Sequence, residues 1–175
     1  MDGKLVFRSD EKLFYGVPGA DGKITHTRMQ GFTAASSNMN TTEYERTYVD
    51  ESHSTTDVTG ISKSIAYSFD RYIGNPVHDD IIDIHHGEKR GTDARRVITM
   101  VDFSTPVENG FKARQNTFSV VCDASGDGAG TDAMVYSGTF KTAGNTVEGV
   151  ATIVTPENGD SENVITIEFT ESAGE

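Results

Sequence analysis

Three histidines and three aspartates lie close together in the stretch NPVHDDIIDIHH, residues 75–86. Imidazole and carboxylate groups are the donors that zinc, manganese and iron prefer in proteins. The candidate donors fall within nine positions and are His78, Asp79, Asp83, His85 and His86. The stretch would bind a metal ion only if the chain positioned several of these side chains around one point.

The same stretch also carries the signals that start and end an α-helix. Asn75 is a favourable N-cap residue, and Pro76 would occupy the first helical position. Gly87 stands where a left-handed residue commonly ends a helix. The aliphatic residues follow the 3.6-residue helical period, so we expect them to pack the helix against the core. This helix-packing stripe consists of Val77, Ile81 and Ile84.

A helix over residues 75–86 limits what the candidate metal ligands can do. Asp79, Asp83 and His86 share one helical face, at i, i+4 and i+7. One helix contributes three ligands at most, and the sequence contains no second cluster of ligand residues. We therefore expect these residues to cap and solubilise the helix without a metal or any other cofactor. A monomeric β-sandwich module that binds a ligand or metal through this helix is the alternative hypothesis.

Charge and composition argue against several classes of function. The 175 residues include 27 acidic and 15 basic ones, a formal net charge of −12, so attraction to nucleic-acid phosphates is not available as a binding force. No catalytic triad, phosphate-binding loop or cysteine pair indicates an enzyme or a structural zinc site. No apolar run approaches the roughly 20 residues that span a membrane. The length predicts a single domain over residues 1–175.

The rest of the sequence is patterned as β-strands. From Ile61 to Ile73 the large apolar residues share one parity, which predicts a strand with one packed face. The opposite, small and polar parity includes Ser62, Ser64, Ser68 and Asp70. In residues 95–103 both parities are apolar, which indicates burial on both sides, and the single cysteine, Cys122, is expected to be buried.

Short turns separate five strand segments after the helix, the last of which is predicted over residues 163–170. Short connections favour antiparallel pairing. We therefore predict a mainly β fold, an antiparallel β-sandwich or open barrel with one flanking α-helix.

Residues 36–60 contain few large apolar side chains and interrupt the strand pattern. A segment of this composition cannot offset the entropy lost on ordering, about 1–2 kcal/mol per residue. Loops of this length inside compact domains are usually functional or disordered. We expect a long extended loop that acts as an assembly arm, mobile in the free subunit and ordered by a neighbour.

Within this assembly arm, alternation along an extended chain selects candidate contact residues. The expected anchors share one side of the chain and are Tyr44, Arg46 and Tyr48. The acidic residues that follow are Asp50 and Glu51. We expect them to pair with Arg95 or Arg96 of a partner subunit.

Several short motifs occur in a fixed order along residues 14–154. They are FYGV, GFT, YVDE, a strand that ends in DRY, a helix that starts GNPVHD, and YSGTFKTAG. In this order they resemble the tail tube proteins, also called major tail proteins, of tailed bacteriophages. No single motif would carry the resemblance without the others.

The resemblance implies a structural protein and not an enzyme. Six copies would form a homohexameric ring whose inner sheets make a continuous barrel, and stacked rings would form a tube that conducts double-stranded DNA into the host without binding it specifically. Other implied partners are tail terminator, tape measure and baseplate or tip proteins, and no membrane. The protein would reside in the virion tail, after synthesis and assembly in the host bacterial cytoplasm. Contractile tails, long flexible tails and tail-like bacteriocins all share this fold.

In such a tube, the polar strand parity of Ser62, Ser64, Ser68 and Asp70 is a candidate for the surface that lines the lumen. A negative wall would repel the DNA phosphates, because Coulomb repulsion reaches over a Debye length of about 10 Å at 0.1 M salt and so acts across a narrow channel. The net charge of −12 is consistent with this hypothesis.

Overall fold

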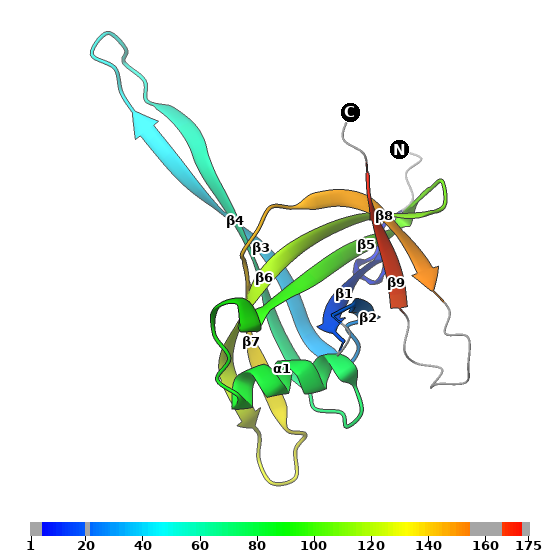
Figure 1. Ribbon diagram of the computed structural model, residues 1–175. Helices are drawn as coiled ribbons and strands as arrows, with labels where there is room; N and C mark the ends of the chain where they lie inside the picture. Colours follow the sequence, from blue (N-terminus) through cyan, green and yellow to red (C-terminus); the bar gives the residue numbers. More distant parts are fainter. Residues whose placement is uncertain (1–4, 20–21, 155–165, 173–175) are drawn as a thin grey trace.

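The computed structural model describes residues 5–19, 22–154 and 166–172, and Figure 1 shows a curved β-sheet structure with one α-helix beside it. The strands in the described residues are β1 (Glu11–Pro18), β2 (Ile24–Arg28), β3 (Phe32–Arg46), β4 (Thr55–Asp70), β5 (Arg95–Val107), β6 (Gly110–Asp127), β7 (Val135–Thr142), β8 (Val147–Val154) and β9 (Thr166–Glu171). The helical elements are η1 (Arg8–Asp10), α1 (Pro76–His86) and η2 (Gly91–Ala94). The described part of the last predicted strand is β9, whereas residues 163–165 lie outside the described residues.

All strand pairings are antiparallel, and the sheet order is β3-β4-β7-β6-β5-β1-β2-β9-β8. Strand β8 also pairs with the first half of β6, so β6, β5, β1, β2, β9 and β8 form a closed ring of pairings. The second half of β6 pairs with β7 instead. The predicted mainly β fold with one flanking helix is confirmed, and its barrel portion is closed.

Side-chain alternation divides the buried residues into two cores. Leu13 and Tyr15 belong to a large cluster with the apolar residues of α1, whereas Phe14 between them belongs to a smaller cluster among β1, β5, β6, β8 and β9. Strand β5 divides in the same way, with Ile98 in the large cluster and Val101 in the small one. The predicted burial on both sides of residues 95–103 is therefore confirmed.

Helix α1 forms as the local signals predict, and its apolar stripe faces the large core. The Asn75 side chain accepts hydrogen bonds from the backbone N–H groups of Val77 and His78. The helix-packing stripe Val77, Ile81 and Ile84 is buried, together with Ile82 and His78.

The C-terminal end of α1 differs from its prediction. Gly87 has φ −80°, so it continues the right-handed conformation, and the left-handed residue is Glu88 with φ 44°. Glycine is still required at position 87, since a Cβ atom there would lie 2.7 Å from the carbonyl oxygen of Asp83.

Three residues expected to be buried are exposed. Cys122 is exposed beside a register shift between β6 and β7. A bulge there turns the chain relative to a regular strand, so alternation no longer predicts its buried positions. Ile61 and Ile73 are 62% and 95% exposed, because the strand extends beyond the core at one end and stops before Ile73 at the other.

Candidate assembly surfaces

Strands β3 and β4 form a long hairpin that extends away from the body of the protein (Figure 1). Pairing runs from Phe32 and Phe69 at its base to Arg46 and Thr55, where an eight-residue connection joins the strands. The predicted extended loop over 36–60 is therefore largely a regular ribbon. Composition alone did not show this, because the backbone hydrogen bonds of a hairpin need no large apolar side chains. We call residues 39–63 the arm.

One face of the arm carries three large apolar side chains and continues the core-facing side of the sheet; we call it the apolar arm face. Ile65 is buried on that side. Lys63, Thr41 and Glu43 lie on the same face of the arm, and its exposed apolar residues are, in order outward, Met39, Ile61 and Val58. These three side chains are 61%, 62% and 57% exposed. A register shift between Thr42 and Glu43 places Val58 opposite Glu43. Because of this shift, Val58 lies on the same face as Ile61, and the apolar arm face extends beyond the irregularity. Among the described residues of the subunit, none buries these three side chains of the apolar arm face.

The predicted anchors lie together at the far end of the arm. Arg46 donates a 2.9 Å hydrogen bond from Nη1 to the Tyr44 hydroxyl, and its guanidinium carbon lies 6.0 Å from the centre of the Tyr48 ring. Asp50 and Glu51 are exposed in the connection, where the Glu51 N–H donates to the Tyr48 carbonyl oxygen at 3.0 Å. The five residues are thus available to a partner, and their contacts with one stay a prediction.

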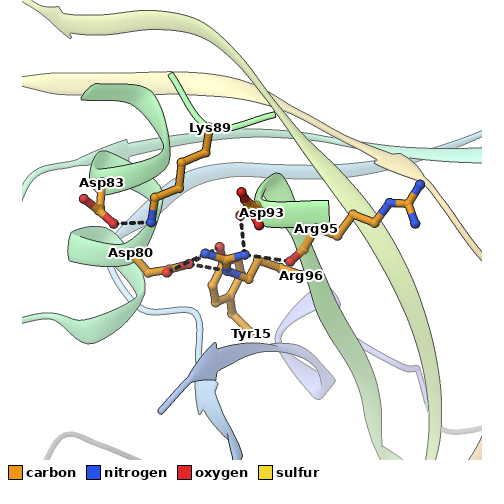
Figure 2. Close-up of polar contacts among 7 residues, drawn as sticks. All are labelled: Tyr15, Asp80, Asp83, Lys89, Asp93, Arg95 and Arg96. Atoms are coloured by element: carbon orange, nitrogen blue, oxygen red, sulfur yellow. Dashed lines mark hydrogen bonds and ion pairs between the residues drawn. The ribbon is translucent and has the colours of Figure 1, made fainter. Parts of the chain in front are cut away.

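The predicted partner residue Arg96 is not available to the arm. Its Nε and Nη2 bind the two carboxylate oxygens of Asp80 at 2.7 and 2.9 Å, and its Nη1 binds the carbonyl oxygens of Asp93 and Arg95 (Figure 2). The Tyr15 hydroxyl donates to Asp80 at 2.6 Å. Burial, followed by the charge of Asp80, raises the pKa of Tyr15 well above its usual value.

This network joins α1 to the start of β5, and each of the three guanidinium nitrogens of Arg96 has at least one acceptor. The expectation that Asp50 or Glu51 pairs with Arg96 is therefore wrong. The Arg95 side chain points away from the network in Figure 2 and is exposed.

The small polar residues of β4 lie on the sheet face opposite the helix. Ser62, Ser64, Ser68 and Asp70 alternate with core residues of β4, and the registers place Ser137 opposite Ser68 and Lys141 opposite Ser64. In residues 34–40, 62–70 and 135–141, the charged residues on this face are Asp70 and Lys141. This small-residue face therefore carries little net charge. Whether it lines a lumen stays a prediction.

Strands β3 and β6 each keep an open edge within the described residues, and so does the arm half of β4, residues 55–63, which pairs with β3 alone. Strand β3 pairs only with β4 along its length. Residues 120–127 of β6 pair with β7 on one side, but β5 ends its pairing on the other side at Arg95 and Ser119. Arg8 donates from Nη2 to the Ala35 carbonyl oxygen at 3.2 Å, a single contact at the base of the β3 edge. Open edges of this kind are templates for pairing with another chain.

The candidate metal ligands of α1 point in different directions. Asp83 forms an ion pair with Lys89, His86 Nε2 lies 3.3 Å from the Tyr136 hydroxyl, and His85 Nε2 lies 3.1 Å from the Tyr67 hydroxyl. Among residues 5–19, 22–154 and 166–172, no group of three or more histidine, cysteine or acidic side chains could hold a metal ion. In the same part of the chain, no helix is long and apolar enough to cross a membrane.

His78 is a buried structural residue instead of a ligand. Its Nδ1 lies 3.3 Å from the backbone nitrogen of Tyr72 and its Nε2 lies 2.9 Å from the carbonyl oxygen of Gln30. An N–H donor on one side and a carbonyl acceptor on the other fix the neutral tautomer with hydrogen on Nε2. The ring also stacks on Phe69, with centroids 4.2 Å apart. Burial lowers its pKa.

Solved structures share this architecture. The SPP1 tail tube aligns with a TM-score of 0.66 over 85% of this chain and 81% of that chain, at 11% sequence identity. The chain has the tail tube fold. Two structures of gene transfer agents also align, namely the tail of an empty particle, solved with C6 symmetry, and the native virion.

These two structures give TM-scores of 0.58 and 0.56, each at 12% identity, over 81% of this chain and 97% of the other. No protein-family model matches the chain, and no curated protein sequence matches it. At such low identity the likeness establishes the fold, and the roles of individual residues depend on their geometry.

Proposed function

We propose that this protein is a structural subunit of a phage or phage-like tail tube. The observation that carries the proposal is the pair of open edges, on β3 and on residues 120–127 of β6, in a chain with the tail tube fold. A protein with two different complementary edges associates head to tail with its own copies, and such contacts close into a ring when the rotation allows it.

Strand directions support a continuous sheet around such a ring. Strands β3, β4, β7 and the second half of β6 alternate in direction, so the two edges of this four-stranded unit run antiparallel to each other. When one copy is rotated beside the next, β3 and β6 therefore meet as an antiparallel pair. We infer six copies in a ring, since the gene transfer agent tail of similar fold was solved with C6 symmetry.

We further propose that stacked rings conduct double-stranded DNA, with the small-residue face of Ser62, Ser64, Ser68 and Asp70 towards the lumen. The net charge of −12 led us to expect a negative lumen wall, whereas the small-residue face carries one acidic residue, Asp70, and one basic residue, Lys141, and is almost neutral. DNA would pass because serine, threonine and alanine offer no cluster of cations to its phosphates. Tail terminator, tape measure and baseplate or tip proteins are the partners inferred from the resemblance, in the virion tail. We infer assembly of the tube in the host bacterial cytoplasm.

A concentration series of the purified protein tests assembly. We expect rings or cylinders in negative-stain micrographs and in sedimentation velocity as the concentration rises. The matched variant deletes residues 40–62 and joins Met39 to Lys63 by Asn-Gly, because these residues are opposite each other and Asn-Gly forms a two-residue hairpin turn. We expect this variant to melt like the full chain and to form no tubes. A protein that stays monomeric at all concentrations would contradict the proposal, and a variant that melts early would show that the arm belongs to the core.

A further inference from the structure

We infer that the apolar face of the arm binds a second copy of this chain, in a cleft beside η2. The cleft has a volume of about 690 Å³. Its apolar residues are Gly16, Pro18, Ile24 and Val97, and its basic residues are Lys89, Arg95 and Arg96. The inference rests on the proposed function, because it takes the β3 edge of one copy to pair with the β6 edge of another.

The pairing registers place the arm at the cleft. Read across the sheet, Ser37 of β3 is level with Val120 of β6, and Asn38 is level with Ser119. If β3 of a neighbouring copy pairs with the open edge of β6 at the same level, the two strands run side by side as far as Ser119 of β6 and Asn38 of the neighbouring β3. Beyond Ser119 the edge is occupied by β5 from Arg95 onwards, so the neighbouring strand must leave the sheet there. The residue at which it leaves is Met39, the first residue of the arm.

The side of the sheet on which the cleft lies determines which face of the arm covers it. Val97 and Thr117 in the cleft lie on the side opposite the large core, since they alternate with the core residues Ile98 and Phe118. An arm that crosses β5 on this side presents its core-facing surface to the cleft. That surface is the apolar arm face of Met39, Ile61 and Val58.

The chemistry of the two surfaces is complementary. Ile24 is 49% exposed in the cleft, so an apolar side chain placed on it removes apolar surface from water on both partners. The arm carries five acidic and two basic residues, whereas residues 88–96 beside the cleft carry four basic and two acidic ones. Glu43 shares the apolar arm face opposite Val58, and the exposed Arg95 is the cation it would meet. The same arm cannot reach its own cleft, because the hairpin extends away from the body (Figure 1).

Intermolecular disulfide formation tests the contact directly. In a Cys122→Ser background the chain has no other cysteine, so Ile61→Cys and Ile24→Cys can be combined as one reporter pair. A disulfide forms only when the two Cα atoms approach to within about 7 Å. We expect covalent dimers and longer ladders on oxidation at concentrations that give tubes. The matched control is Ile61→Cys with Ile153→Cys, another half-exposed isoleucine on β8, which should not crosslink.

Charge reversal gives a second, independent measurement. Glu43→Arg and Arg95→Glu should each raise the concentration needed for assembly by about tenfold or more, because each places like charges together. The double variant, which pairs opposite charges again, should bring this concentration most of the way back to that of the unaltered chain. Lys112→Glu makes the same change of charge on β6 away from the cleft and should have little effect.

The outcomes separate this inference from the proposed function. If the unaltered chain forms no rings or tubes and the reporter pair does not crosslink, both are wrong. If tubes form but the reporter pair crosslinks no more than its control, the proposed function stands and the cleft is not the site of the arm. Charge variants that are not rescued in the double variant, or a Lys112→Glu effect of equal size, would also overturn the contact.

Discussion

Arg96 and Asp80 form a bidentate ion pair, with N–O distances of 2.7 and 2.9 Å, between side chains that are only 8% and 12% exposed. The pair connects the second turn of α1 to the first residues of β5. Burying two charges costs hydration free energy, and the attraction between the charges together with the hydrogen bonds of the network offsets that cost. The pair therefore fixes where the helix sits more than it adds to the total stability.

Removing one partner of this pair should be strongly destabilising. Asp80→Ala leaves the Arg96 guanidinium buried without a counter-ion and removes the acceptor of the Tyr15 hydroxyl. We expect the free energy of unfolding to fall by about 3–5 kcal/mol in chemical denaturation. Asp83→Ala, which breaks the exposed pair with Lys89, is the control and should change little. Equal effects of the two substitutions would show that the buried pair has no special role.

Helix α1 should depend on its apolar stripe and not on its histidines. Ile81→Asp loses about 1.5–3 kcal/mol of apolar burial and adds an unpaired buried charge, so we expect a failure to fold or a large drop in melting temperature. His86→Ala removes one contact to Tyr136 from an exposed residue and should have a small effect. Metal analysis of the purified protein completes the test. Stoichiometric zinc, manganese or iron retained without chelator would support the alternative metal-binding module.

Acid should destabilise the protein through His78. Burial lowers the pKa of His78 from about 6.5, despite smaller opposing effects of Gln30, Asp79 and Asp70. The unfolded state therefore binds a proton more readily, so stability is complete above about pH 6.5 and falls as the pH drops towards the lower folded-state pKa.

The matched variant for this pH effect is His78→Gln, whose amide offers an acceptor and a donor but does not titrate. We expect its unfolding free energy to change less between pH 7 and pH 5 than that of the unaltered protein, with His26 and His85 as the remaining histidines whose pKa is lowered. Parallel pH profiles for the two proteins would assign the acid sensitivity to other residues.

Gly138 should not accept a side chain. A Cβ atom there would lie 2.5 Å from the Tyr67 hydroxyl oxygen and would also overlap the carbonyl oxygen of Val121. Gly138→Ala should therefore destabilise the fold by about 1–3 kcal/mol, measured by thermal or chemical unfolding. Gly144→Ala, where the nearest side-chain atom is 3.5 Å away, is the control and should be tolerated.

Local signals predicted α1 because its cap, its first-turn proline and its apolar period all lie within twelve consecutive residues. The ion pair of Asp80 and Arg96 was not predictable in this way, since no periodic pattern links two residues on different elements. Arg96 was instead interpreted as an exposed contact residue. The available signal was an arginine within the first residues of a strand whose two faces both carry apolar residues.

The arm shows a second limit of sequence patterns. Counting large apolar side chains over residues 36–60 indicated a loop, but regular backbone pairing does not depend on that count. In the sequence, strict alternation assigns only Ile61 to the apolar arm face. Val58 is three residues away from Ile61 and lies on the same face because of a register shift, which alternation does not predict. The cleft and the open β6 edge depend on which distant strands pair, and no local pattern contains that information.

Strands β1, β5 and β6 supply residues to both buried clusters, and this sharing has a consequence for how the molecule comes apart. Neither core can lose its strands while the other keeps them, so the body should behave as one cooperative unit with a single unfolding transition. The arm shares no buried residue with either core. Its amide protons should exchange with solvent first, from the connection at residues 47–54 inward, while those of β1, β5 and β6 exchange only through global unfolding.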